Sequence, residues 1–87
     1  MTEPKTVERV QTGVRLERRL LKVMKGVAEL HEMSLGDLIE GVMLHALEGK
    51  APFRPATLKR IAQLRAVYRL DLTAADSHLL TEAIDDR

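Results

Sequence analysis

The residue types used for nucleophilic catalysis stand side by side once in this sequence, as Asp76-Ser77-His78. A serine nucleophile needs a histidine base and an orienting acid within hydrogen-bond reach of one another. Thr73 precedes this run and is typical of a helix N-cap, so we expect the run to lie on a short helix. Consecutive residues of a helix point in different directions, so these side chains cannot form a catalytic set. The sequence therefore predicts a protein that is not an enzyme.

Metal and cofactor chemistry has no better support in the sequence. His31, His45 and His78 are not paired at a spacing of four residues, and the chain contains no cysteine, so no zinc-ligand pattern is present. The five glycines are scattered and do not form a phosphate-binding loop. We expect no catalytic residue, no bound metal and no cofactor.

The charge of the chain is distributed in blocks that its net charge of +1 conceals. Residues 1–25 carry +4, residues 26–50 carry −4, residues 51–70 carry +5 and residues 71–87 carry −4. Clustered positive charge neutralises the phosphates of nucleic acids, so the two basic blocks are candidates for such contacts. Either block taken alone is also typical of a solvated surface.

Residues 9–16 alternate between polar and apolar side chains, which is the period of a β-strand with one buried face. The apolar positions are Val10, Thr12, Val14 and Leu16, and the polar positions are Arg9, Gln11, Gly13 and Arg15. The chain contains no second alternating run, and a single strand with unpaired backbone groups is unstable. The strand is therefore expected to pair with the same strand of a second copy, which makes the protein a homodimer.

Two helices are expected to follow the strand. Residues 17–31 place apolar side chains at helical spacing. The second helix is predicted to begin at Ser34, which together with Asp37 resembles a capping box, and to end at Gly49. Its apolar face is so wide that we expect most of the second helix to be buried.

The C-terminal part is expected to add two more helices after a proline-containing linker. Pro55 suits the first turn of a third helix over residues 56–69. Thr73 is then expected to cap a short fourth helix. The apolar face of this fourth helix would consist of Ala75, Leu79, Ala83 and Ile84.

The order of strand, helix and capped helix over residues 9–49 resembles the ribbon-helix-helix DNA-binding proteins of the Arc, MetJ and CopG type. The residues that carry the resemblance are Val14-Arg15-Leu16, the segment Met24-Lys25-Gly26-Val27-Ala28-Glu29, and Ser34. It implies a mainly α fold in which one N-terminal strand per chain pairs antiparallel with its partner in an intertwined homodimer, here with two additional C-terminal helices. Residues 1–8 would form a flexible arm, residues 9–49 the DNA-binding domain and residues 50–87 a helical extension.

In that family the paired strands enter the major groove of double-stranded DNA, and their outward side chains touch base edges. By position, the base-contacting residues here are Gln11, Gly13 and Arg15. Glutamine can form two hydrogen bonds with adenine and arginine two with guanine, whereas Gly13 has no side chain with which to read a base.

The resemblance also implies contacts to DNA phosphates. Members of the family set the N-terminus of the second helix against the DNA backbone, and Ser34, Leu35 and Gly36 match those positions. We expect Arg9 and Arg18 to add phosphate contacts.

These features predict a sequence-specific DNA-binding protein that acts as a bacterial transcriptional regulator or repressor. One alternative is an antitoxin that binds DNA with the ribbon and a protein partner with residues 51–87. A second alternative is a helical interaction module without a nucleic-acid role, in which the basic helix of residues 56–69 pairs with acidic surfaces. We expect a cytoplasmic protein without a membrane contact, because no apolar run approaches the ~20 residues of a membrane span and the first residues lack signal-peptide features.

Overall fold

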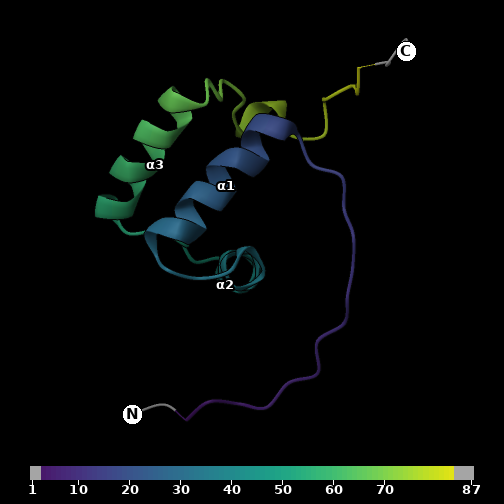
Figure 1. Ribbon diagram of the computed structural model, residues 1–87, viewed down its shortest axis with the longest axis vertical. Coiled ribbons are helices and arrows are strands. Elements are labelled where there is room, and N and C mark those ends of the chain that lie inside the picture. Colours follow the sequence, from purple (N-terminus) through teal and green to yellow (C-terminus); the bar gives the residue numbers. More distant parts are fainter. Residues whose placement is uncertain (1–2, 84–87) are drawn as a thin grey trace.

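The computed structural model describes residues 3–83. Within this part of the chain the regular elements are three helices, α1 (Arg18–Leu30), α2 (Leu35–Leu47) and α3 (Pro55–Val67), followed by a single turn of 3₁₀ helix, η1 (Ala74–Asp76). Helix α1 is the central element, because both α2 and α3 pack against it (Figure 1). The protein is thus mainly α, as predicted. Among residues 3–83, no helix combines the length and the apolar character needed to cross a membrane.

The starts of the first two helices are determined by side chains that accept hydrogen bonds from free backbone amides. Ser34 caps α2, since its Oγ accepts from the N–H of Asp37 at 3.1 Å. Glu17 caps α1 and accepts from the N–H groups of Arg19 and Leu20 at 3.0 and 2.9 Å. The predicted N-cap at Ser34 is therefore confirmed.

The three helices end in the same kind of turn. Each is followed by a residue with positive φ, namely Glu32 (54°), Gly49 (73°) and Arg69 (54°). After α1, for example, the N–H of Met33 donates to the carbonyl of Ala28 at 3.0 Å, which is the long hydrogen bond of a Schellman motif. Only at Gly49 does the sequence provide the residue that adopts this conformation without steric cost.

The core is small and lies where α1 meets both other helices. Its buried residues are Val23, Val27, Ala28, Leu38 and Leu70. Gly26 allows α3 to approach closely, because a Cβ at that position would lie 3.1 Å from the side chain of Leu64. The expectation that most of α2 is buried is wrong for the single chain, in which Leu38 is its one buried residue. The reason is that α1 covers only one side of α2, which leaves the apolar side chains Met43, Leu44 and Leu47 exposed.

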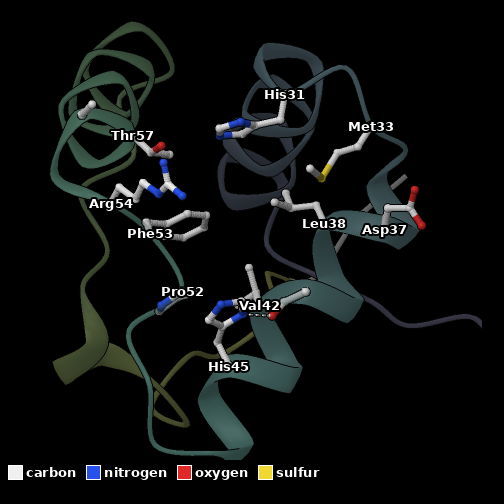
Figure 2. Close-up of a pocket in the computed structure, with 12 residues that line it drawn as sticks. His31, Met33, Asp37, Leu38, Val42, His45, Pro52, Phe53, Arg54 and Thr57 are labelled. Carbon is white, nitrogen blue, oxygen red and sulfur yellow. Dashed lines mark hydrogen bonds between the residues drawn. The ribbon is translucent and has the colours of Figure 1, made fainter. Parts of the chain in front are cut away.

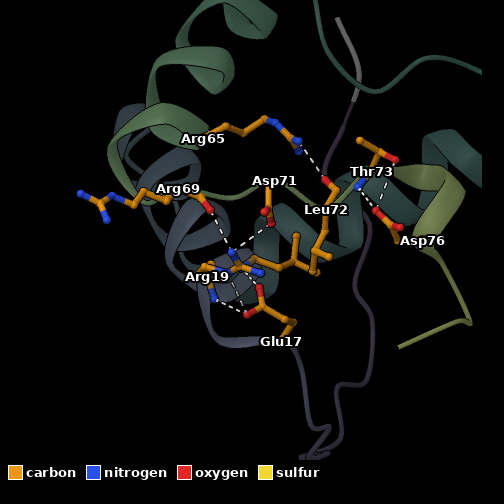
Figure 3. Close-up of polar contacts among 9 residues, drawn as sticks. Glu17, Arg19, Arg65, Arg69, Asp71, Leu72, Thr73 and Asp76 are labelled. Carbon is orange, nitrogen blue, oxygen red and sulfur yellow. Dashed lines mark hydrogen bonds and ion pairs between the residues drawn. The ribbon is translucent and has the colours of Figure 1, made fainter. Parts of the chain in front are cut away.

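Polar contacts fix the segment after α3 against the start of α1 (Figure 3). The guanidinium of Arg19 donates to the carbonyl of Arg69 at 3.0 Å and to the carboxylate of Asp71 at 2.9 Å. The guanidinium of Arg65 donates to the carbonyl of Leu72 at 2.8 Å. These bonds hold Leu70 in the core beside α1.

The predicted fourth helix is wrong for the residues that the structure describes. Thr73 does close a local capping box, because its N–H donates to the Asp76 carboxylate at 2.8 Å. The helix ends there, since Ser77 is extended (ψ 132°) and His78 has a φ of 67°. Leu79 is 75% exposed and finds no apolar surface to pack on, so no burial offsets the cost of forming a longer helix. Ile84, the last residue of the predicted helix, lies outside the described residues.

The N-terminal segment leaves the helices as an extended thread (Figure 1). Residues 3–17 contain no regular secondary structure, and no strand occurs anywhere in residues 3–83. The radius of gyration is 15.1 Å, against about 12 Å for a compact chain of this length. The predicted strand over residues 9–16 would need a second strand for its backbone hydrogen bonds, and the single chain offers none.

Candidate nucleic-acid interface

The side chains of residues 9–16 are exposed on both faces of the extended segment. Arg9, Gln11 and Arg15 are open to solvent, as is the backbone at Gly13. The apolar positions are equally uncovered, with Val10 at 79% and Val14 at 72% exposure. Apolar side chains at alternate positions without any cover are unusual for an isolated chain, and they mark the segment as a surface that is incomplete by itself.

Arg9 joins this segment to α2. Its Nε and Nη2 donate to the two carboxylate oxygens of Glu40, both at 2.9 Å, and its Nη2 lies 4.0 Å from the carboxylate of Asp37. The hydrogen bonds from Arg9 lower the pKa of Glu40 below its ordinary value. The fork of an arginine on a carboxylate has the same geometry as an arginine on a phosphate. Arg9 is thus placed beside the first turns of α2, and a phosphate would have to replace Glu40 as its partner.

Arg15 is also paired with an acidic residue of the same chain. Its guanidinium contacts the carboxylate of Glu82, which belongs to the segment after η1. Both side chains are exposed, so solvent and salt weaken this pair and DNA can compete for the arginine. Gln11 makes no side-chain hydrogen bond to any of residues 3–83.

Gly13 has no close neighbour among residues 3–83 that a side chain would meet. A Cβ built at this position would meet nothing within 4 Å, and the φ of Gly13 is not positive. Neither a close approach nor a special backbone conformation within the chain therefore requires glycine here. The absence of a side chain matters only for a molecule outside the chain.

The first turn of α2 presents free backbone amides beside Arg9. The N–H of Asp37 is taken by Ser34 and the N–H of Leu38 donates to the Ser34 carbonyl, whereas those of Leu35 and Gly36 have no acceptor among residues 3–83. The side chain of Leu35 packs against the core, so only its backbone is available to a ligand. The exposed carboxylate of Asp37 disfavours an anion at this helix end, and its proximity to Arg9 reduces that effect.

A second basic surface lies around Arg18, which the sequence predicted as a phosphate contact, and it joins the two basic blocks in a way that the sequence did not predict. A hollow of about 350 Å³ between the start of α1 and the end of α3 is lined by Arg18, Arg19, Lys22, Val67, Tyr68 and Arg69. We call it the basic hollow. The Nζ of Lys22 lies 5.8 Å from the ring centre of Tyr68. The two basic blocks of the sequence indicated candidate phosphate-binding residues, but the contact between the two blocks depends on how α3 packs on α1.

Another cavity, of about 510 Å³, lies at the opposite end of α1 (Figure 2). His31, His45 and Arg54 are among its lining residues, and they lie at the C-terminal cap of α1, on α2 and at the N-terminal cap of α3. The Nδ1 of His45 is 2.7 Å from the carbonyl oxygen of Gly41, one helical turn earlier, so this ring is engaged with its own helix. No group of three His, Cys, Asp or Glu residues within 3–83 could hold a metal ion.

The run Asp76-Ser77-His78 does not form a catalytic arrangement. The carboxylate of Asp76 accepts from the backbone N–H and the hydroxyl of Thr73, at 2.8 and 3.4 Å. Ser77 and His78 follow η1 and are exposed. The sequence placed the run on a helix; the structure places only Asp76 on the 3₁₀ turn.

Comparison of the chain with protein-family models, with curated proteins and with solved structures gave no match in any of the three.

Proposed function

We propose that this protein is a sequence-specific DNA-binding homodimer that acts as a transcriptional regulator, with residues 9–16 of two chains paired in an antiparallel ribbon in the major groove. The observation that carries the proposal is the alternating segment with an uncovered apolar face and a polar face that carries arginine and glutamine. A polypeptide segment of this kind is stable only when another strand and an apolar surface complete it.

An apolar hollow in the helical part supports a second copy as the missing partner. It has a volume of about 320 Å³ and opens between α1, α2 and the chain around α3. Its lining is apolar except for Arg65 and consists of Leu20, Val23, Met24, Val27, Leu38, Ile39, Val42, Met43, Phe53, Ile61, Arg65 and Leu70. The exposed apolar side chains of residues 9–16 would suit this apolar lining. The predicted strand also needs a second strand for its backbone hydrogen bonds.

The polar face of the ribbon supports DNA as the ligand. Gln11 and Arg15 are the side chains that pair with adenine and guanine in the major groove, each with about 1–3 kcal/mol of discrimination. Arg9 contacts the carboxylates of Glu40 and Asp37 on the first turns of α2, the helix whose first amides, those of Leu35 and Gly36, are free to hold a phosphate beside the ribbon. Arg18 follows on the first turn of α1.

The proposal is tested by selection of DNA from a random pool, followed by titrations with the selected sequence. A dimer of this type should select an inverted repeat, because each subunit reads one half-site and the two subunits are related by a two-fold axis. The double variant Gln11→Ala with Arg15→Ala should lose the preference for the selected over a scrambled sequence while it remains dimeric. The matched control is Gln63→Ala with Arg60→Ala, which removes the same residue types from the exposed surface of α3. Equal discrimination by both double variants would show that the ribbon is not the reading element.

A second candidate function is favoured by the segment after η1. Leu79 and Leu80 are exposed there without regular structure, in a part of the chain with negative net charge. An antitoxin-like tail that orders on a protein partner has such features. Hydrogen exchange of the free protein separates the alternatives: fast exchange throughout residues 56–83 would favour a tail that folds on its partner. Slow exchange in α3 would restrict the segment that folds on a partner to residues 77–83.

A further inference from the structure

The basic hollow contains more cationic side chains than the ion pairs of the fold engage. Of its four cations, Arg19 is engaged by Glu17 and Asp71 in the contacts that anchor the segment after α3 (Figure 3). Arg18, Lys22 and Arg69 have no carboxylate within 4.0 Å among residues 3–83. Three uncompensated cations around one concave surface have the chemistry of a site for negatively charged oxygens.

Arg18 and Arg19 occupy positions of α1 where a positive charge is electrostatically unfavourable for the helix. Arg18 and Arg19 occupy its first turn, which contains no acidic residue, and the positive end of a helix dipole repels cations there. Glu17 already accepts from the amides of this turn, so the attraction of the hollow for an anion comes from side chains. Glu17 and Asp71 compensate Arg19, whereas the unfavourable position of Arg18 suggests that this cation serves a bound anion.

Arg69 is a further residue whose position works against stability. It occupies the left-handed turn after α3, with a φ of 54°, where glycine would avoid a steric cost. Its carbonyl accepts from Arg19, whereas its guanidinium extends away from that cluster into solvent (Figure 3). The backbone of the turn needs no side chain here, and the guanidinium has no carboxylate or carbonyl partner among residues 3–83.

The basic hollow lies immediately beside the proposed ribbon. Arg18 follows Arg15 by three positions, which corresponds to at most about 11 Å of extended chain. We infer that the basic hollow binds backbone phosphates of the DNA that flank the ribbon, with Lys22 and Arg69 acting beside Arg18. This inference rests on the proposed function and gives α3 a role in it, because α3 delivers Arg69 to the phosphate-binding surface.

The test is the salt dependence of DNA binding by the variants Arg69→Gly and Lys22→Gln. Arg69→Gly removes the guanidinium and leaves a residue that suits the left-handed turn, so the fold is retained. Each phosphate contact contributes about 0.9 to the slope of log K against log salt, so one lost contact per subunit lowers the slope by about 1.8 per homodimer. Between 50 and 200 mM salt, the loss of affinity then becomes about 12-fold smaller than for the unaltered protein. The matched control is Arg60→Ala, which removes a cation from the middle of α3, outside the basic hollow.

The expected result is a reduced slope for both variants, on selected and on random DNA alike, with an unchanged slope for Arg60→Ala. Unchanged slopes for Arg69→Gly and Lys22→Gln, in a protein that still selects its DNA sequence, would overturn the inference and leave the proposed function intact. No DNA binding by the unaltered protein at low salt would overturn both. Thermal unfolding of Arg69→Gly at or above the temperature of the unaltered protein would exclude misfolding as the cause of a reduced slope.

Discussion

Val14 and Val67 are two valines with almost the same exposure in the single chain, 72% and 71%. Val14 belongs to the apolar face of residues 9–16, whereas Val67 is the last residue of α3. In the proposed dimer Val14 is buried against the partner chain and Val67 remains at the surface. Replacement of each valine by alanine therefore removes the same atoms from two different environments.

The magnitude expected for Val14→Ala follows from the apolar atoms that it removes. Burial of each methylene-sized group contributes about 0.8 kcal/mol, so loss of two groups from each of two subunits weakens the dimer by about 3 kcal/mol. This corresponds to a rise of roughly 200-fold in the dissociation constant of the dimer. Val67→Ala should change that constant by no more than about twofold, because surface substitutions have small effects.

Sedimentation velocity over a concentration series measures both dissociation constants. Circular dichroism of each variant at a concentration where it is dimeric verifies that the helices are unchanged. Equal dissociation constants for Val14→Ala and Val67→Ala would refute the argument that the apolar face of residues 9–16 is covered by the partner. A chain that remains monomeric at every concentration would refute the dimer itself.

Three further predictions concern the free energy of unfolding, measured by urea denaturation. Glu32→Gly should stabilise the protein by about 1 kcal/mol and Gly49→Ala should destabilise it by a similar amount, because both residues have positive φ; the same sign for both variants would contradict this reasoning. The carboxylate of Glu17 accepts a hydrogen bond from the backbone N–H of Arg19, and this is the main cause that lowers the pKa of the carboxyl below its ordinary value of 4.5. The contribution of the ionised Glu17 carboxylate to the free energy of unfolding is therefore complete above about pH 4.5 and is lost as the pH falls through the lowered pKa. Glu17→Gln should make the free energy of unfolding less dependent on pH below about 4.5. Gly26→Leu should cost about 1–3 kcal/mol, since a Cβ at this position already lies 3.1 Å from a leucine side chain of α3; an unaltered stability would show that α3 is not held tightly to α1.

The helices could be predicted from the sequence because local signals determine their ends. Ser34 caps α2, Gly49 takes the left-handed turn after it, and Pro55 begins α3. The fourth helix was predicted from the same kind of signal, a capping threonine, and only one turn of it forms. The difference lies in packing, because Leu70 reaches the core whereas Leu79 finds no apolar surface.

Only the part of the candidate site that follows from the alternation of polar and apolar residues could be predicted from the sequence. The exposed polar face of residues 9–16 follows from the alternation itself. The pair between Arg9 and Glu40 joins residues 31 positions apart, and the contact between Arg19 and Asp71 joins residues 52 positions apart. No local pattern encodes such pairs, since they depend on how the helices pack.

The position of the C-terminal extension links the two proposed surfaces. Its residues Phe53, Ile61 and Leu70 form one wall of the apolar hollow that the second copy would occupy. Arg69, next to Leu70 in the chain, lines the basic hollow on the other side of α1's first turns. Because the hydrogen bonds from Arg19 and Arg65 fix this stretch of chain, a shift of Leu70 on dimer formation would also move Arg69. The pairing of two chains and the binding of flanking phosphates, both proposed above, are therefore expected to be coupled through the extension.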